Sequence, residues 1–268
     1  KLMSNNQLIT IYITNFNYSN YLDKAIKSAL GQTYKNFEII IVDDNSKDNS
    51  KQVLKKYEHN KKISIIYNQS QKGLIRSANI AISKSKGSFF LRLDADDYLH
   101  KDAIKTMFGM IKNVPNAALV FSNFYIFNNR SKKISHVDLD PQKKWNIKKE
   151  PPHGACSLIN KKFFNRVGGY NKKFDRQDGY YIWISFLLNN YKLIHCKKRL
   201  FYYRKHNKSL SFDLIKKFKV RLDILRFFSK KNIKFENILI NNIKKTILKL
   251  QGLKKKKNEL FSKFRKKN

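Results

Sequence analysis

Leu91-Arg92-Leu93-Asp94-Ala95-Asp96-Asp97 is the most informative stretch of this chain, because an apolar run from Ser88 ends there in three carboxylates within four positions. A buried strand that ends in this way places acidic side chains at one edge of a sheet. Divalent cations that bind phosphate prefer hard oxygen ligands on a rigid element, with coordination positions left open for a substrate. Acidic pairs are also common in turns and helix caps, so the stretch indicates a metal site only where other segments supply its partners.

Strand-like and helix-like patterns alternate through the first part of the chain. We expect strands at residues 8–13, 37–42, 63–67 and 88–93 and helices at residues 20–30, 48–57, 73–84 and 101–111, with Ser19 as the N-cap of the first helix. This alternation is typical of right-handed βαβ units in a mostly parallel sheet, which binds ligands at the carboxyl ends of its strands. Two of those ends are acidic, at Asp43-Asp44 and at residues 94–97, so we expect both at one edge of the sheet.

The rest of the chain follows a looser pattern. We expect strands at residues 118–127, 133–137, 155–160, 193–196 and 199–203 and a helix at residues 180–190. Residues 138–152 are polar and irregular, which indicates a loop over the site. From residue 212 the sequence predicts a helical, basic and amphipathic region. The predicted fold class is therefore α/β, with a mostly parallel central sheet flanked by helices and a basic helical C-terminal extension.

The composition is that of a folded protein with one large domain, or one domain and an appendage. The chain has 268 residues, of which 41% are hydrophobic, with 4 Pro and 9 Gly. The two cysteines, Cys156 and Cys196, form neither a disulfide framework nor a zinc-binding pattern, which favours a reducing compartment. No apolar run reaches the length of a membrane span and no secretory signal is visible, so we expect a cytoplasmic location.

Positive charge is concentrated toward the C-terminus. The net charge is +38, and residues 212–268 alone hold 19 Lys/Arg and 4 Asp/Glu. An apolar stripe runs through the same region, at Ile240, Ile243, Ile247, Leu250, Leu253, Leu260, Phe261 and Phe264. A basic amphipathic helix of this kind can lie on an anionic membrane, which favours a peripheral position on the inner face of the cytoplasmic membrane. It can also pack on the rest of the chain or on a second subunit of a homo-oligomer, with its lysines in solvent.

A series of short motifs runs in a fixed order through about residues 7–211. The motifs are Ile13-Thr14-Asn15-Phe16-Asn17, Ser28-Ala29-Leu30-Gly31-Gln32-Thr33-Tyr34-Lys35-Asn36-Phe37-Glu38, Val42-Asp43-Asp44-Asn45-Ser46-Lys47-Asp48, Gly73-Leu74 with Asn79, Lys86-Gly87, Asp94-Ala95-Asp96-Asp97, Gly168-Gly169-Tyr170, Gln177-Asp178 and Tyr203-Arg204-Lys205-His206-Asn207-Lys208-Ser209-Leu210-Ser211. In this order and spacing they resemble the glycosyltransferase family 2 enzymes, which have the GT-A fold. The resemblance implies a nucleotide-sugar-binding half at residues 1–99 and an acceptor-binding half of the same domain at residues 100–211, followed by the basic region at residues 212–268.

The resemblance implies a donor site at the ends of the first strands. Asp44 would accept the N3–H of a uracil or thymine ring, and Thr14 and Phe16 would line that pocket. Asp94 would face the ribose. The implied donor is therefore a UDP- or dTDP-sugar.

The resemblance also implies a metal site and a general base. Asp96 would bind a Mg²⁺ or Mn²⁺ ion that bridges the donor diphosphate, and His206 stands where many members place a second metal or diphosphate contact. Asp178 would take the proton from the acceptor hydroxyl as that oxygen attacks the anomeric carbon, and a single in-line displacement inverts this centre. The implied activity is metal-dependent transfer of a sugar to a hydroxyl of a glycan or lipid-linked acceptor, in the assembly of bacterial surface polysaccharide or lipopolysaccharide.

The chain departs from the family pattern at a few positions. Gln177 replaces the glutamate that commonly precedes the base. Ala78 stands where many members have arginine, so the diphosphate contact is expected to pass to Arg76 or Lys72. Asn45 replaces a common glycine after the paired aspartates, and asparagine tolerates the left-handed backbone that such a turn requires.

Ordinary structural roles remain open for several of these residues. Asp43 and Asp44 can cap the helix that follows them, and Asp178 can cap the helix that begins near it. Asp97 is expected to bond the backbone near its turn. His153 is expected to touch the acceptor or, as a loop histidine, to have no role.

Two other classes of function compete with sugar transfer. A basic nucleic-acid-binding protein fits the charge and the 13% aromatic content, but no nucleic-acid-binding motif is present, and the acidic strand ends repel phosphate unless a metal ion intervenes. A GT-A-like nucleotidyltransferase typically carries a glycine-rich loop with Arg or Lys after its first strand, and residues 14–20 lack one. We therefore expect a nucleotide-sugar donor and no nucleic-acid partner.

Overall fold

The computed structural model describes residues 6–127, 134–139, 156–206 and 213–230, together with residues 243–244, 246–249 and 251–252. The chain forms two compact units, Lys1–His206 and Asn207–Asn268. The first unit contains the sheet and every candidate site residue. The second contains α7 (Leu214–Ser229), which agrees with the helical start predicted for the basic region.

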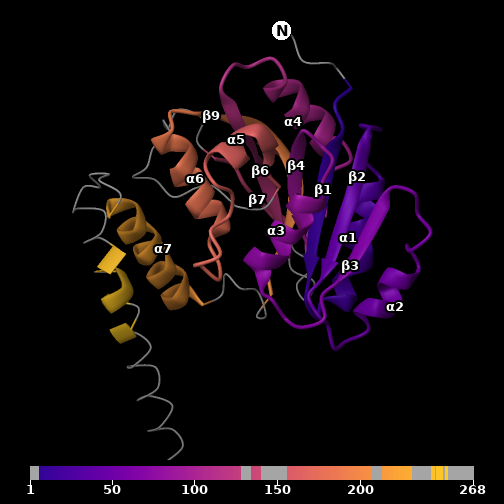
Figure 1. Cartoon of the computed structure of the whole chain (residues 1–268), viewed down its shortest axis with the longest axis horizontal. Coiled ribbons are helices and arrows are strands. Elements are labelled where there is room, and N and C mark those ends of the chain that lie inside the picture. Colours follow the sequence, from indigo (N-terminus) through magenta and orange to yellow (C-terminus); the bar gives the residue numbers. More distant parts are fainter. Residues whose placement is uncertain are drawn as a thin grey trace, which may run out of the picture. The chain divides into compact units, whose positions relative to one another are not determined.

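The described residues of the first unit form a nine-stranded sheet with a parallel half of order β3-β2-β1-β4. The strands of this half are β1 (Ile9–Asn15), β2 (Phe37–Asp43), β3 (Ile63–Tyr67) and β4 (Phe89–Asp94). They run side by side (Figure 1), and β1 pairs in parallel with both β2 and β4. The helices that connect them are α1 (Ser19–Leu30), α2 (Ser50–Lys55) and α3 (Leu74–Lys84). The predicted α/β class is thus confirmed.

Beyond β4 the sheet continues in mixed orientation, in the order β8-β6-β9-β5, and β7 pairs with β6. The strands of this half are β5 (Tyr98–Leu99), β6 (Ala117–Phe127), β7 (Ile134–Val137), β8 (Leu158–Asn160) and β9 (Lys192–Arg204). Its helices are α4 (Ala103–Ile111), α5 (Lys161–Arg166) and α6 (Asp178–Leu188). Only β9 runs parallel to its neighbour β6, and the other new pairs are antiparallel.

The central strand β1 is buried on both faces. Ile9, Ile11 and Ile13 point to one side and share a core with residues of α1 and α4. Tyr12 points to the other side, where its hydroxyl lies 3.2 Å from that of Tyr170. Side chains alternate between the two faces of a strand, so a strand covered on both sides reads as a continuous apolar run. This is why the first strand was recognisable in the sequence.

Several details differ from the sequence predictions. α1 begins at Ser19, with Tyr18 as its N-cap and no side-chain cap, so the predicted capping by Ser19 is wrong. The Ser19 N–H instead donates to Asp48 Oδ2 (2.9 Å). The two strands predicted at residues 193–196 and 199–203 form the single strand β9, whose register against β6 shifts twice near Asn123. The short elements α5 and β5 were not predicted.

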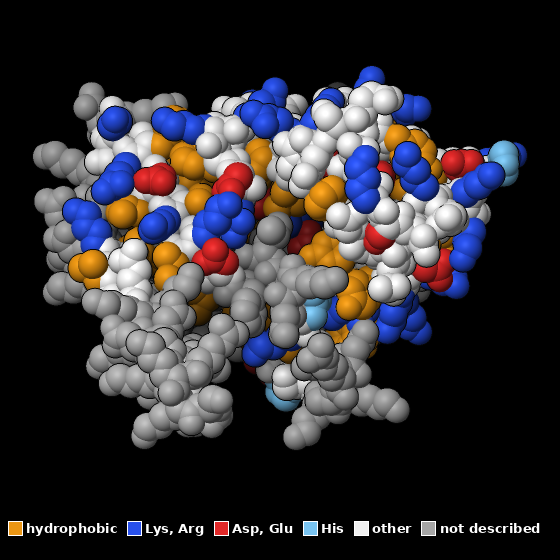
Figure 2. All heavy atoms as spheres, turned by 90° about the horizontal axis from the view of Figure 1, so that it is seen from below, with side chains coloured by type: hydrophobic (Ala, Val, Ile, Leu, Met, Phe, Trp, Pro, Cys, Tyr) orange, Lys and Arg blue, Asp and Glu red, His pale blue; other side chains and the backbone are white. Residues whose placement is uncertain are grey.

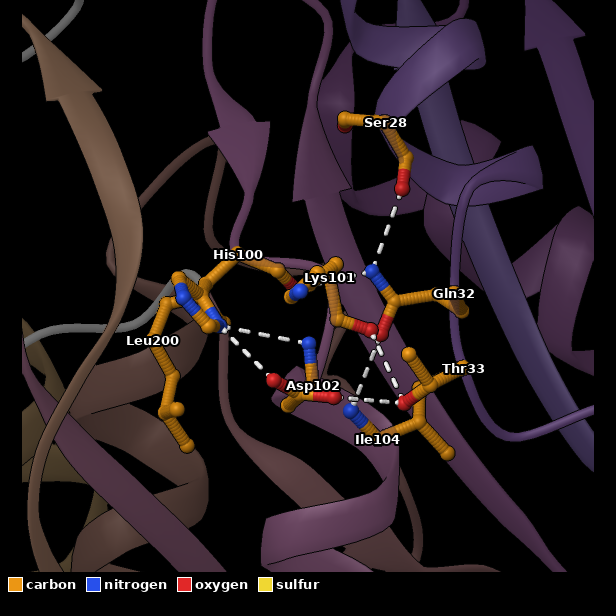
Figure 3. A network of polar contacts seen from close by, with 9 residues as sticks. Ser28, Gln32, Thr33, His100, Lys101, Asp102, Ile104 and Leu200 are labelled. Carbon is orange, nitrogen blue, oxygen red and sulfur yellow. Dashed lines mark hydrogen bonds and ion pairs between the residues drawn. The ribbon is translucent and has the colours of Figure 1, made fainter.

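Gln32 ties the end of α1 to the segment that follows the acidic stretch (Figure 3). Its side chain is fully buried. The amide nitrogen donates to the carbonyls of Ser28 (3.1 Å) and His100 (2.9 Å), and the amide oxygen accepts from the backbone N–H of Ile104 (3.1 Å). The motif around Gln32 therefore has a structural role here, because it positions the chain between the acidic cluster and α4.

Gln32→Ala is expected to lower the free energy of unfolding by about 3 kcal/mol. The substitution leaves buried backbone groups unpaired, and each such group costs about 1–3 kcal/mol. Urea unfolding followed by circular dichroism measures the change. Thr33→Ala is the matched control, since it removes an exposed hydroxyl that donates to Asp102 (2.7 Å) and should cost at most about 1 kcal/mol. Equal losses in the two variants contradict the structural role of Gln32.

Candidate active site

Three carboxylates converge where β4 ends. The Asp97 N–H donates to the Asp94 carbonyl (3.0 Å), which closes a tight turn. One carboxylate oxygen from each of Asp94, Asp96 and Asp97 lies within 4.8 Å of the others. Asp94 pairs with Thr14 across β4 and β1, so the cluster stands at the carboxyl edge of the parallel strands. This is the position that the sequence predicted for a ligand site.

The electrostatics of this cluster fit a divalent cation. Burial raises the pKa of Asp94, with Arg92 opposing and Asp96 adding to the rise. Burial, then the charges of Asp96 and Asp94, raise the pKa of Asp97 well above its ordinary value. Asp97 Oδ1 accepts from the Arg204 N–H (2.8 Å), but Oδ2 is buried and has no hydrogen-bond partner among the described residues. Crowded carboxylates with an unsatisfied oxygen are stabilised by a bound Mg²⁺ or Mn²⁺.

His206 lies against this cluster, 110 positions after Asp96 in the sequence. Its Nε2 is 2.8 Å from Asp96 Oδ2. The imidazole ring also packs near the rings of Tyr18 and Tyr21, with centroid distances of 5.8 Å and 5.5 Å. The structure therefore brings together the two residues predicted as metal ligands, and their role as ligands stays a prediction.

Arg204 holds the backbone of the acidic turn. Its Nε donates to the Asp96 carbonyl (2.6 Å), and its own N–H donates to the Asp97 carboxylate. The guanidinium lies over the rings of Tyr21 and Phe127, 4.3 Å and 4.2 Å from their centroids. These contacts agree with the backbone-bonding role expected of Asp97.

Asp178 is joined to the acidic cluster through Arg92. Asp178 is the first residue of α6 and is only 6% exposed. Arg92, on β4, donates from Nη1 to Asp178 Oδ2 and from Nε to Asp94 Oδ1 (2.6 Å). Burial opposes the charge of Arg92, but Asp178 and Asp94 outweigh burial and raise the pKa of Arg92 well above its ordinary value. The residue predicted as the base thus stands on the same side of the sheet edge as the donor candidates.

Asp44 organises the loop before α3. Its Oδ1 accepts from Asn68 Nδ2 (2.7 Å) and from the Lys72 N–H (2.8 Å), and its Oδ2 accepts from the Gly73 N–H (2.7 Å). Gly73 has φ +84°, a conformation that glycine adopts without strain. Asp44 does not cap α2, so that alternative is wrong; the first turn of α2 is bonded by Asp48 instead. Since Oδ2 has one protein donor, it keeps acceptor capacity for a ligand.

Asp43 closes the turn that follows β2. Its carboxylate accepts from Asn15 Nδ2 (2.7 Å), from the Ser46 N–H (3.0 Å) and from the Ser46 hydroxyl (2.6 Å). Its alternative role as a cap of α2 is therefore also wrong. Asn45 has φ +62°, which confirms the prediction that asparagine carries the left-handed backbone here.

Three further residues were predicted to bind the donor, namely Thr14, Phe16 and Arg76. Thr14, in β1, and Phe16, just after it, are half-buried. Arg76 is exposed on the first turn of α3, and within the described residues no hydrogen bond or ion pair joins it to another candidate. The donor-binding roles of all three stay predictions.

Several predictions concern residues outside the described part of the chain. These are His153, residues 140–152 of the expected loop, and Ile240, Leu250, Leu253, Leu260, Phe261 and Phe264 of the tail stripe. Across the residues that the structure does describe, no helix has the length and apolar character needed to cross a membrane. The membrane-surface and second-subunit interpretations of the tail both stay predictions.

No role was predicted for Arg92, Tyr12 or Tyr170, although the charge of Asp178 acts on all three. Burial raises the pKa of both tyrosine hydroxyls, so they remain protonated at neutral pH. For Arg92 a signal was present in the sequence: it is a charged residue inside an apolar strand, and a buried arginine needs a carboxylate partner. That signal does not identify Asp178 as a partner, because Asp178 lies 86 positions away.

On the face shown in Figure 2, the basic side chains of the described residues are dispersed. On the face shown, lysine and arginine are spread among hydrophobic and acidic side chains rather than gathered in one stripe. Proteins that bind nucleic acid typically concentrate their positive charge on one face or along one helix. Among the described residues on this face, the charge pattern therefore gives no support to a nucleic-acid interface.

Known proteins share this sequence pattern and this fold. The profile described as Glycosyl transferase family 2 matches residues 10–168. The chain is 28% identical over 225 residues to the UDP-Glc:alpha-D-GlcNAc-diphosphoundecaprenol beta-1,3-glucosyltransferase WfgD of Escherichia coli, over 82% of this chain and 86% of that protein. It is 29% identical over 187 residues to the uncharacterized glycosyltransferase RC0461 of Rickettsia conorii, over 66% of this chain and 31% of the length of that relative.

A solved structure supports the fold. The mannosyltransferase PcManGT from Pyrobaculum calidifontis, in complex with GDP-Man and Mn²⁺, superposes with a TM-score of 0.65 at 11% identity, over 89% of this chain and 68% of that one. At this identity the likeness concerns the fold alone. It confirms the fold that the motifs implied.

Proposed function

This chain belongs to glycosyltransferase family 2, and on that premise we propose that it transfers a sugar from a UDP- or dTDP-sugar to a hydroxyl group of a glycan or lipid-linked acceptor. The transfer depends on Mg²⁺ or Mn²⁺ and inverts the anomeric centre. The observation that carries this proposal is the grouping of Asp94, Asp96, His206 and Asp178 at the carboxyl edge of one sheet.

At the donor end, the proposed role of Asp44 is to accept the ring N3–H through its carboxylate, beside Thr14 and Phe16. Asp44 is 4% exposed and held by three protein donors, so its position is set before a ligand arrives. Asp94 faces the ribose, and Arg76 contacts the diphosphate. A carboxylate that is already held in place loses little conformational entropy when the nucleotide binds, which favours affinity for the nucleotide.

Asp96 and His206 would hold the cation, with the other carboxylates of the cluster beside them. When bound, the cation acts as a Lewis acid that stabilises the charge of the leaving diphosphate by several kcal/mol. The oxygen-rich donor set of this chain supports this assignment.

Asp178 serves as the general base. The acceptor oxygen forms a bond to the anomeric carbon while the bond from that carbon to the diphosphate oxygen breaks, and the hydroxyl proton passes to the carboxylate of Asp178. Oδ2 of Asp178 is bound to Arg92, so Oδ1 is the oxygen that receives the proton. The nucleoside diphosphate leaves with the electron pair of the broken bond.

One relative with broad coverage supports a proposal for the acceptor class. WfgD, by its name, acts on an undecaprenol diphosphate that carries GlcNAc, and its similarity extends over 82% of this chain. We infer a lipid-linked acceptor in bacterial surface-polysaccharide assembly, at the inner face of the cytoplasmic membrane. The net charge of +38 supports contact with anionic lipid.

Discrimination between nucleobases tests the proposed function. UDP and dTDP, whose rings carry an N3–H, should bind about 10- to 100-fold more tightly than CDP, because a hydrogen bond to a charged acceptor is worth about 1.5–3 kcal/mol. In Asp44→Asn the ratio of the affinity for UDP to the affinity for CDP should fall toward one. Isothermal titration with Mn²⁺ present measures both ratios.

Asp23→Asn is the control for this experiment, because Asp23 lies on α1, where it pairs with Lys27 and accepts from the Tyr57 hydroxyl, and it is no part of the proposed donor site. It should keep the discrimination of the wild type. Equal binding of UDP and CDP by the wild type contradicts the role of Asp44. Failure of the wild type to bind any nucleoside diphosphate, with or without Mn²⁺, contradicts the proposed function itself.

A further inference from the structure

Arg92 occupies an unusual position for a charged residue. It lies within β4, two residues before Asp94, and is only 8% exposed. Its neighbours in the strand, Leu91 and Leu93, are buried in the core on the other face of the sheet. An arginine that is desolvated to this degree is stable only where carboxylates surround it.

The guanidinium of Arg92 contacts two carboxylates from different elements at the same time. Its Nε edge meets Asp94, which ends the same strand, at 2.6 Å, and its Nη1 meets Asp178 at the start of α6. Guanidinium is planar and presents its donors in a rigid fork, so the two carboxylates take fixed directions relative to each other. The Tyr12 and Tyr170 hydroxyls, 3.2 Å apart, belong to the same buried region.

We propose that Arg92 is a positioning residue, which orients the acceptor-side carboxylate of Asp178 relative to the donor-side carboxylate of Asp94. This inference rests on the proposed function, because it assigns Asp178 to the base and Asp94 to the donor. Displacement needs the acceptor oxygen, the anomeric carbon and the leaving oxygen in line. A misplacement of about 1 Å can cost about 100-fold in rate.

A purely structural role for Arg92 is the alternative to test. In that case the ion pair only anchors α6 to the sheet, and its loss lowers stability without acting through the base. The two roles differ in how the Arg92 and Asp178 substitutions combine. Residues that act as one unit show non-additive effects on rate, whereas independent effects multiply.

The experiment is a double-mutant cycle of Arg92→Lys and Asp178→Asn, measured as transfer from a radiolabelled nucleotide sugar in the full chain. Lysine keeps the charge but cannot hold two carboxylates in the fixed fork. Arg92→Lys alone should lower kcat by about 100-fold. In the Asp178→Asn background the same change should cost less than about threefold, since the base it positions is already absent.

Two controls separate misfolding from mispositioning. Arg226→Lys alters an exposed pair with Asp223 on α7 and should leave kcat unchanged. Stabilisation of Arg92→Lys by UDP with Mn²⁺ shows that the donor site is intact. Should Arg92→Lys fail to fold, Arg92→Gln takes its place in the cycle, since its amide can reach only one of the two carboxylates.

The outcomes are distinct. The positioning role is overturned if Arg92→Lys lowers kcat by the same factor in the wild type and in Asp178→Asn. It is also overturned if the kcat of Arg92→Lys lies within about threefold of the wild-type value. If the wild type transfers sugar and Asp178→Asn does so equally well, the assignment of the base is wrong and the inference falls with it. A wild type that transfers sugar from no nucleotide donor overturns the proposed function rather than the geometry of Arg92.

Discussion

Asp178→Asn is expected to lower sugar transfer by about 1,000-fold while UDP binding persists. General-base catalysis contributes about 10²- to 10⁴-fold to such reactions, and an asparagine amide cannot take up the acceptor proton. Asparagine has nearly the same shape as aspartate, and its oxygen can still accept from Arg92, so the local structure is retained. Transfer of a radiolabelled sugar measures the loss, and calorimetric titration with UDP and Mn²⁺ shows that the donor site remains.

Asp175→Asn is the matched control for this prediction. Asp175 lies three positions earlier, is more than half exposed, and pairs loosely with Arg176 (3.6 Å). The same chemical change at this position should leave the transfer rate close to that of the wild type. Retained transfer in Asp178→Asn refutes the base assignment, and loss of UDP binding in that variant shows that Asp178 acts on the donor site instead.

The parallel half of the fold could be predicted because its signal is local. The strands β1, β2 and β4 are covered on both faces, so the sequence shows short apolar runs separated by helical periodicity. The mixed half depends on pairings between distant segments. β5 has two residues and exists through its pairing with β9, so it carries no periodic signal of its own. The register shifts that bend β9 near Asn123 likewise arise from its contact with β6.

The acidic half of the site could be predicted for a related reason. Asp44, Asp94 and Asp96 follow strands that were recognisable, and parallel strands bring their carboxyl ends to one edge. Arg92 and Arg204 could not be assigned in this way. Their distant partners, Asp178 and Asp97, lie 86 and 107 positions away, and these pairings are set by how α6 and β9 pack on the sheet.

The motifs combine binding and structural residues, which the sequence alone does not separate. Glu38 belongs to the same motif as Gln32, and its carboxylate accepts from the Thr10 hydroxyl (2.7 Å) and from the N–H groups of Lys86 (2.6 Å) and Gly87 (3.2 Å). These contacts stand near the amino end of β1, away from the acidic cluster. The motif at residues 28–38 and the Lys86-Gly87 motif therefore share one structural contact, while the acidic cluster lies at the opposite edge of the sheet.

Asp96→Asn is expected to lower transfer by about 1,000-fold and to abolish the response to metal. Loss of a charged oxygen ligand weakens the hold on a cation whose Lewis acidity is worth several kcal/mol in the transition state, and each 1.4 kcal/mol corresponds to about tenfold in rate. Wild-type protein with UDP should gain thermal stability on addition of Mn²⁺, and EDTA should remove that gain. The variant should show the same melting temperature with UDP alone as with UDP and Mn²⁺.

The control and the non-additivity of this effect distinguish metal binding from loss of structure. Asp102→Asn changes an exposed carboxylate that accepts from Thr33, and it should keep the full response to Mn²⁺. EDTA should reduce wild-type transfer to the level of Asp96→Asn and should have no further effect on that variant, because both treatments remove the same contribution. If Asp96→Asn responds to Mn²⁺ as the wild type does, the cation is not held by Asp96, and the orphaned oxygen of Asp97 becomes the first position at which to seek it.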